Sequence, residues 1–258
     1  MAKLPPQPRA VLFDAYGTLF DVYSVGLLAE QLFPGRGEAL AQLWRDKQID
    51  YTRLLTLAGR YQPFWQLTRA GLRFAAQRLQ LALTPEAEDS LMNQYRHLSA
   101  FPENHDVLRE LQRRGVATGI LSNGDPEMLA VATRSAGFDG LLQHVLSVHG
   151  VQRFKTDPAA YALGPQALGL PARDILFVSS NGWDAIGATW FGYTTLWVNR
   201  ANLPLEQLGT APTHTGSSLR DVLAFFPAVP AIPAAAAVPA VPAVPAIPAL
   251  PALPVLPI

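Results

Sequence analysis

The sequence predicts an α/β protein with a Rossmann-like, doubly wound parallel sheet as its core and a helical cap inserted into that core. Three observations support this fold class. Short, continuous apolar runs recur along the chain, as is typical of strands buried on both faces. Helical stretches separate these runs, and repeated strand–helix units favour an open parallel sheet with helices on both faces. Residues 21–98, which contain no strand-like run, are expected to form the cap.

The expected strands are apolar runs, several of which end in polar or turn-forming residues. They cover residues 10–13, 116–121, 145–148, 175–178 and 194–198. The run at 145–148 is shorter and weaker than the run at 116–121 that precedes it. Because ligands bind such sheets at the carboxyl ends of the strands, these ends are where a functional site is expected.

The expected helices of the core lie between these strands, and those of the cap precede the second strand. The core helices cover residues 107–114, 126–136, 159–168 and 183–191, and the cap helices cover 25–32, 36–57, 63–79 and 85–98. Pro126 and Pro158 suit first-turn positions, because a first-turn residue needs no backbone donor. Gly115, Gly137, Gly169 and Gly192 suit helix ends.

The chain therefore divides into three parts in this interpretation. Residues 1–20 and 99–226 form the core, residues 21–98 the cap, and residues 227–258 a tail. The tail has 32 residues, ten of them proline and none charged. Since each proline removes a backbone donor and fixes φ, we expect a disordered, polyproline-II-like extension. A ligand for an aromatic groove, or a self-association segment, is the alternative.

Composition excludes several classes of function. The chain has 258 residues, with 20 Lys and Arg balanced by 20 Asp and Glu, so its formal net charge is zero. That balance argues against a nucleic-acid partner. The absence of cysteine excludes disulfides, thiolate metal sites and a cysteine nucleophile. The first nine residues lack the apolar region of a signal peptide, and no uninterrupted run suits a membrane helix, so a cytoplasmic protein is expected.

Polar residues follow four of the expected strands. Asp14 follows the first, Ser122-Asn123-Gly124 the second and Ser179-Ser180-Asn181 the fourth, with Asp184 shortly after, while Lys155 follows the third across a short loop. Each one alone is explained by turn chemistry, a helix N-terminal charge or a solvated lysine. Together they predict one crevice with two carboxylates, an ammonium and several hydroxyl and amide groups.

Such a set supports nucleophilic displacement by a carboxylate. Asp14 is the candidate nucleophile, and Lys155 beside it would keep it ionised, because an opposite charge lowers a carboxylate pKa. Asp184 is then free to orient or deprotonate a water molecule.

These residues carry a resemblance to a known family. The segment from Phe13 to Leu19 resembles the first motif of the haloacid dehalogenase superfamily, and the segment from Leu121 to Gly124 resembles the second. Lys155 resembles the third motif, and the segment from Ser179 to Asp184 the fourth. The resemblance covers residues 9–226. In the cap, residues 33–37 and 43–48 resemble the L-2-haloacid dehalogenases in particular.

Two departures from the phosphatases of this superfamily indicate the branch. Tyr16 stands where those enzymes have a second aspartate, and Ser180-Asn181 replaces the first acid of their fourth motif. A hard divalent cation needs more anionic oxygens than remain. The resemblance therefore implies an enzyme that needs no metal ion and no cofactor.

The resemblance also implies a role for each site residue. The expected activity is hydrolysis of L-2-haloalkanoic acids to D-2-hydroxy acids: Asp14 attacks C2, halide leaves, and water cleaves the aspartyl ester. The other catalytic residues would be Thr18, Lys155, Tyr161, Ser179, Asn181 and Asp184. Ser122 and the N–H groups of Ala15 and Tyr16 would hold the substrate carboxylate. Arg45 and Asn123 would receive the halide, and Tyr16, Ile49, Phe64 and Trp183 would form an apolar wall.

Other interpretations stay open on the sequence alone. A related hydrolase that opens a strained ring amino acid would keep most of these residues, and a magnesium-dependent phosphatase is a weaker alternative. A non-enzymatic interaction protein that uses its tail is a third. Asp46 would oppose an anionic substrate if it faced the pocket. The resemblance implies a homodimer whose only ligands are the small 2-haloacid and its products.

Overall fold

The computed structural model describes residues 7–227. The predictions made for the start of the chain and for the conformation of residues 228–258 therefore lie outside the described residues. Among those described, no helix combines the length and apolarity that a membrane span requires.

The core is a six-stranded sheet in the order β3-β2-β1-β4-β5-β6, and every neighbouring pair is parallel. The predicted fold class is confirmed. The strands are β1 (Ala10–Phe13), β2 (Ala117–Ser122), β3 (His144–Ser147), β4 (Ile175–Ser179), β5 (Thr194–Val198) and β6 (His214–Gly216). The sequence did not predict β6, which has three residues and no apolar run, because its backbone pairs with β5 at the sheet edge while its side chains stay largely exposed.

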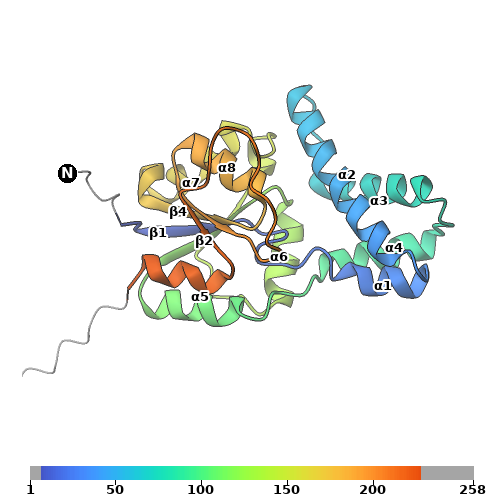
Figure 1. Cartoon of the computed structure of the whole chain (residues 1–258), viewed down its shortest axis with the longest axis horizontal. Coiled ribbons are helices and arrows are strands. Elements are labelled where there is room, and N and C mark those ends of the chain that lie inside the picture. Colours follow the sequence, from blue (N-terminus) through green and yellow to red (C-terminus); the bar gives the residue numbers. More distant parts are fainter. Residues whose placement is uncertain (1–6, 228–258) are drawn as a thin grey trace, which may run out of the picture. The chain divides into compact units, whose positions relative to one another are not determined.

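Helices cover both faces of the sheet. They are α5 (Asn104–Arg113), α6 (Pro126–Ser135), α7 (Pro158–Leu168) and α8 (Gly182–Phe191). Successive residues of β1 point to opposite faces: Val11 and Phe13 belong to the apolar cluster that includes α5 and α6, and Leu12 to the cluster that includes α7 and α8. Figure 1 shows α5 on one side of the strands and α7 and α8 on the other.

The predicted helix boundaries hold to within a few residues. Pro126 and Pro158 each occupy the first turn of their helix. The four glycines expected at helix ends all have positive φ, at Gly115 (70°), Gly137 (68°), Gly169 (62°) and Gly192 (107°). Glycine adopts this conformation without the steric cost of a Cβ, which is why these helices end there.

Four helices lie between β1 and β2 in the chain, as expected for a cap. They are α1 (Val25–Leu32), α2 (Gly37–Leu57), α3 (Phe64–Arg78) and α4 (Pro85–Arg96). The long helix α2 packs against α1 and α3. A Cβ at Gly71 would lie only 3.2 Å from the carbonyl oxygen of Trp44, so this glycine permits the close approach of α3 to α2. The boundaries drawn between core, cap and tail remain a prediction.

Candidate active site

Asp14 directly follows β1, the strand between β2 and β4, and its side chain is buried. Three donors from three parts of the chain reach its carboxylate. Lys155 Nζ lies 3.0 Å from Oδ1, while Thr18 Oγ1 at 3.0 Å and Asn181 Nδ2 at 2.9 Å donate to Oδ2. The carboxyl ends of parallel strands meet at one edge, which explains why residues so far apart in sequence converge. The network fixes both oxygens of the candidate nucleophile.

Lys155 bridges two carboxylates. Its ammonium lies 3.0 Å from Asp14 Oδ1 and 2.9 Å from Asp184 Oδ2, and its side chain is fully buried. Burial alone would lower the pKa of this ammonium, but the two carboxylates outweigh burial and raise its pKa. Lys155 is therefore a fixed positive charge at the centre of the site.

Asp184 lies in the first turn of α8 and is fully buried. Besides Lys155, it accepts a 2.7 Å hydrogen bond at Oδ1 from the Tyr161 hydroxyl. Burial raises the pKa of Asp184, and the charge of Asp14 raises it further, against the opposing effects of Lys155 and Tyr161. Burial also raises the pKa of Tyr161 well above its usual value, so this phenol keeps its proton and acts as a donor.

The loop after β4 holds the other side of Asp14. Ser180 N–H donates to Thr18 Oγ1 at 2.8 Å, and Asn181 N–H donates to the buried Ser179 hydroxyl at 3.1 Å. The Asn181 amide also donates to the carbonyl of Tyr16 at 3.1 Å. Ser179 thus orders the turn that presents Asn181, and Asn181 joins this loop to the loop after β1.

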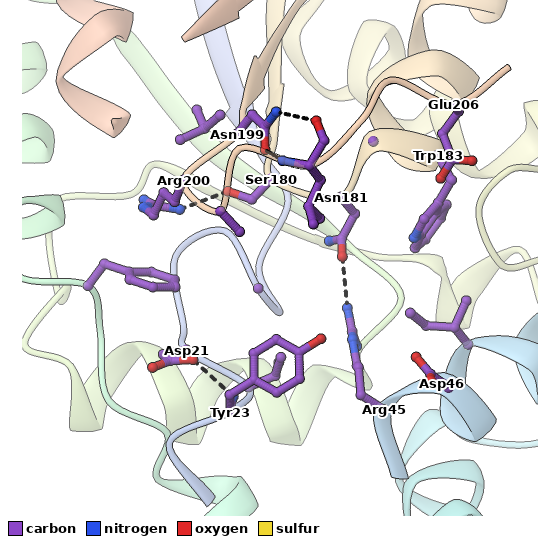
Figure 2. A pocket seen from close by; sticks show the side chains of 18 of the residues that line it. Asp21, Tyr23, Arg45, Asp46, Ser180, Asn181, Trp183, Asn199, Arg200 and Glu206 are labelled. Atoms are coloured by element: carbon purple, nitrogen blue, oxygen red, sulfur yellow. Dashed lines mark hydrogen bonds between the residues drawn. The ribbon is translucent and has the colours of Figure 1, made fainter. Parts of the chain in front are cut away.

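Arg45 reaches the site from α2, although it belongs to the cap. Its guanidinium donates to the carbonyl of Tyr16 at 2.9 Å. It also donates to Asn181 Oδ1 at 3.3 Å, as Figure 2 shows. It is buried, and its other terminal nitrogen donates to Gln48 Oε1 at 2.7 Å. A cap residue therefore completes a site whose other charged groups come from the core.

Gln48 is a residue that sequence reasoning did not place in the site. Its amide nitrogen donates to Thr68 at 2.6 Å, and its oxygen also accepts from Tyr95 at 3.1 Å. Every polar atom of this side chain thus has a partner on another cap helix, and together they orient Arg45. The available signal was its position one helical turn after Arg45, on the same face of α2.

A small pocket lies directly beside Asp14, here named the inner pocket. Its lining contains nearly all of the predicted substrate residues and one unpredicted residue, Thr52; it consists of Asp14, Tyr16, Arg45, Ile49, Thr52, Phe64, Ser122, Asn123, Asn181 and Trp183. The ring of Tyr16 lies 5.6 Å from that of Phe64, centroid to centroid. Apolar side chains of core and cap thus enclose the nucleophile.

Donors for an anion are present beside this pocket. Within residues 7–227, the backbone N–H groups of Ala15 and Tyr16 have no hydrogen-bond acceptor. The Ser122 hydroxyl accepts from Gly124 N–H at 3.0 Å, which leaves its own proton available to donate. Asn123 Oδ1 accepts from Lys155 N–H at 2.9 Å, which fixes this amide beside the lysine loop.

A larger cavity of about 490 Å³ adjoins the inner pocket and is named the outer cavity (Figure 2). Arg45, Ile49, Asn181 and Trp183 line both spaces. Asp46 lines only the outer cavity, where it is exposed and accepts from Gln42 at 3.0 Å. Its charge therefore does not face the inner pocket.

Arg200 is a second residue that sequence reasoning missed. It lies two residues after β5 and donates to Ser180 Oγ at 2.7 Å (Figure 2). It also donates to Glu103 at 2.9 Å. Its guanidinium carbon lies 3.9 Å from the centroid of the Phe101 ring. Its signal in the sequence is its position just after the fifth strand, because polar residues that follow parallel strands converge at one edge of the sheet.

The potential metal ligands of the described part of the chain are dispersed. Within residues 7–227, no group of three His, Asp or Glu side chains has the geometry to hold a metal ion. The predicted independence of metals and cofactors remains a prediction.

The fold and this site define a class of protein. A family model described as haloacid dehalogenase-like hydrolase matches residues 8–192. The chain therefore belongs to the haloacid dehalogenase-like hydrolase family, as the sequence motifs indicated.

Several similar proteins are named 2-haloacid dehalogenases. The chain is 45% identical over 218 residues to an (S)-2-haloacid dehalogenase of Pseudomonas sp. strain YL, covering 84% of this chain and 94% of the relative. The crystal structure of the L-2-haloacid dehalogenase RSc1362 superimposes with a TM-score of 0.84 at 60% identity, covering 86% and 99% of the two chains. An L-2-haloacid dehalogenase from Xanthobacter autotrophicus with covalently bound chloropropionic acid has a TM-score of 0.78 at 35% identity, covering 83% and 96%.

Proposed function

We propose that the protein is an (S)-2-haloacid dehalogenase, a hydrolase that converts L-2-haloalkanoic acids to D-2-hydroxy acids. The observation that carries this proposal is the environment of Asp14. Its carboxylate is buried, both oxygens are held by donors, and it lies beside a pocket with apolar walls and one arginine. A carboxylate shielded from water is a stronger nucleophile toward carbon than a solvated one.

In the first step, an oxygen of Asp14 attacks C2 of the substrate from the side opposite the halogen. The new O–C2 bond forms as the C2–halogen bond breaks, so the configuration at C2 inverts and halide leaves with the bonding electrons. Arg45 and Asn123 receive this anion, and a guanidinium suits the task because it is always charged and weakly hydrated. The product of this step is an ester between the carboxyl group of Asp14 and the C2 oxygen of the future 2-hydroxy acid.

In the second step, Asp184 takes a proton from water, and the resulting oxygen nucleophile attacks the carbonyl carbon of the Asp14 ester. The acyl C–O bond breaks, the oxygen on C2 takes the proton back from Asp184, and Asp14 is regenerated as a carboxylate when the second proton of the water is released to solvent. Because C2 is not attacked again, the hydroxy acid keeps the inverted configuration. Lys155 and Tyr161 hold Asp184 in place for this step, at 2.9 Å and 2.7 Å respectively.

The substrate carboxylate binds the Ser122 hydroxyl and the N–H groups of Ala15 and Tyr16. Convergent backbone and hydroxyl donors favour an anion. The substituent at C2 lies against Tyr16, Ile49, Phe64 and Trp183. Thr18, Ser179 and Asn181 keep Asp14 in position through the hydrogen bonds described above.

Halide release from L- and D-2-chloropropionate, measured separately in the presence of EDTA, tests the proposal. Release from the L form alone is the expected result. Release from both forms would contradict the stereochemistry, and release abolished by EDTA would contradict the metal independence. No release from either would overturn the proposal, and strained ring amino acids and phosphate esters with magnesium would then be the substrates to assay.

The same proposal includes a cytoplasmic homodimer. Apolar side chains on two cap helices support the dimer: Leu27 on α1 is 77% exposed, and Leu57 on α2 is 86% exposed. Light scattering on the purified protein tests the dimer, and a monomer mass at micromolar concentration would contradict it. Cell fractionation tests the location.

A further inference from the structure

The carboxylate of Asp125 caps a helix other than its own. Asp125 is the N-cap residue of α6, a position where aspartate normally accepts from the first turn of the helix that follows. Here its side chain makes no hydrogen bond to α6. Instead, Oδ1 accepts from Phe64 N–H at 3.0 Å and Oδ2 accepts from Trp65 N–H at 2.7 Å, sixty residues earlier in the chain.

Helix α3 depends on this carboxylate for its N-terminus. Its own N-cap residue is Pro63, whose side chain has no acceptor, and its first turn contains no acidic residue. The first N–H groups of a helix have no partner within the helix, and the helix dipole places positive charge there. Asp125, which is 8% exposed, supplies both the missing acceptors and a negative charge.

The contact joins two walls of the inner pocket. Phe64 is the first residue of α3 and lines that pocket, and Asp125 follows closely after Ser122 and Asn123, which line it from the core. The turn between them is tightly packed, because a Cβ at Gly124 would lie 2.6 Å from the Tyr16 ring. One core loop thus carries polar groups of the pocket and also holds an apolar wall that belongs to the cap.

We infer that Asp125 is a positioning residue: it fastens the N-terminus of α3 to the core and thereby sets Phe64 against the substrate. This inference rests on the proposed function. Asp125 acts through Phe64 and does not touch the inner pocket itself. His149, whose Nδ1 lies 3.5 Å from Asp125 Oδ1, and Tyr61, whose hydroxyl contacts that ring at 3.0 Å, flank the carboxylate on its other side.

The expected kinetic effect is on substrate binding rather than on chemistry. Asp14, Lys155 and Asp184 make no contact with Asp125, so the reacting groups stay in place when it is replaced. Phe64 is apolar and takes no part in the bond changes, so its contact with a substrate should be as strong in the bound state as in the transition state. Losing such a contact raises KM while kcat changes little. We expect Asp125→Ala to raise KM about tenfold, the effect of losing one apolar contact. Asp125→Asn, which keeps one acceptor, should have a smaller effect.

A double-mutant cycle identifies the route of the effect. If Asp125 acts through Phe64, then Asp125→Ala should add little to the KM of Phe64→Ala, because coupled residues are not additive. Full additivity of the two substitutions would overturn the inference.

Glu30 provides a matched control for a merely structural role. Its carboxylate accepts from Gly35 N–H at 2.5 Å and from Gly37 N–H at 2.9 Å, so it too caps a cap helix, α2, but within the cap. Glu30→Gln should loosen that turn without changing KM. A KM increase in Glu30→Gln equal to that in Asp125→Asn would show general loosening of the cap and would overturn the inference.

Amide hydrogen exchange distinguishes a failure of this inference from a failure of the proposed function. In Asp125→Ala, amide exchange should accelerate at Phe64, at Trp65 and in the loop after β1 that contains Tyr16. In Glu30→Gln, amide exchange should accelerate at Gly35 and Gly37. If the wild type releases no halide, the proposed function is wrong and exchange alone decides. Unchanged exchange at Phe64 and Trp65 would then overturn the inference about Asp125.

Discussion

The hydroxyl of Tyr161 donates a 2.7 Å hydrogen bond to Oδ1 of Asp184, and both side chains are buried. This bond favours the ionised carboxylate and so lowers the pKa of Asp184, against the larger effect of burial, which raises it. In the proposed mechanism Asp184 must be ionised to accept a proton from water, so the balance between these effects should set the acid limit of turnover.

The first prediction concerns this acid limit. Because burial raises the pKa of Asp184 whether or not Asp14 is esterified, kcat should fall at a pH above the usual value of about 3.9 for aspartate. Tyr161→Phe removes a lowering contribution, so the acid limb of the kcat profile should move to still higher pH. Tyr193→Phe is the matched control, because that hydroxyl donates to the carbonyl of Tyr161 at 2.6 Å and not to Asp184. An acid limb that stays at the same pH in Tyr161→Phe would contradict the assignment.

The second prediction concerns the nucleophile. Asp14→Asn should lower kcat by at least roughly a thousandfold, because the amide cannot form the ester. Mass spectrometry of the variant before and after the assay shows whether asparagine has been hydrolysed back to aspartate. Asp106→Asn, at an exposed residue 3.6 Å from Arg220, is the control and should be fully active. Wild-type turnover by a verified Asp14→Asn protein would exclude Asp14 as nucleophile.

The third prediction separates the two steps. Asp184→Asn should still allow Asp14 to attack, but hydrolysis of the ester should become rate-limiting because no carboxylate remains to deprotonate water. The acid-quenched variant should then carry one propionate unit on the peptide that contains Asp14 after reaction with L-2-chloropropionate. One halide ion per enzyme should be released in a burst. If halide is released steadily and no adduct forms, another group activates the water.

The fourth prediction concerns stability. Lys155→Met leaves Asp14 and Asp184 buried without their shared cation, and breaking a buried ion pair on one side costs about 3–5 kcal/mol. Urea unfolding measures this loss. Lys47→Met is the control: Lys47 lies 3.0 Å from Asp50 in a partly exposed surface pair, which contributes at most about 1 kcal/mol. Equal losses of unfolding free energy in both variants would mean that the buried ion pairs of Lys155 stabilise the fold no more than a surface pair does.

The fifth prediction concerns the tail. Residues 228–258 consist only of Pro, Ala, Val, Ile and Leu, so they offer no side chain for acid, base or nucleophilic chemistry. A chain that ends at Pro227 should keep the kcat and KM of the full chain in the halide assay. A tenfold loss of activity with unchanged unfolding would show that the tail contributes to the site.

The sequence predicted those parts of the fold and site that depend on local pattern. The runs at 10–13 and 194–198 match β1 and β5, because buried parallel strands are continuous and apolar. Asp14, Ser122 and Asn181 could be placed together because parallel strand ends share one edge. The hydrogen bond from Asn181 to Asp14 is possible because the two residues follow neighbouring strands.

The residues that escaped prediction act through contacts between distant elements. Gln48 and Thr52 look like ordinary polar residues of an amphipathic helix until α2 is packed against α3 and the core. In the sequence, Asp125 directly precedes the first residue of α6 and is therefore expected to cap that helix. Only the folded structure shows that its carboxylate caps α3. Local sequence pattern predicts the helix or strand on which a residue lies, whereas tertiary packing decides which groups its side chain contacts.

The bridge that Lys155 forms between two carboxylates has a consequence for the order of events. In the free enzyme, the charge of Asp14 raises the pKa of Asp184. In the proposed mechanism, esterification removes that charge but leaves the ammonium of Lys155, which lies 2.9 Å from Asp184 in the free enzyme. The repulsion therefore ends at the moment when Asp184 is needed as an ionised base, and the pKa of Asp184 falls. Completion of the first half-reaction would thus prepare the base for the second through charge alone.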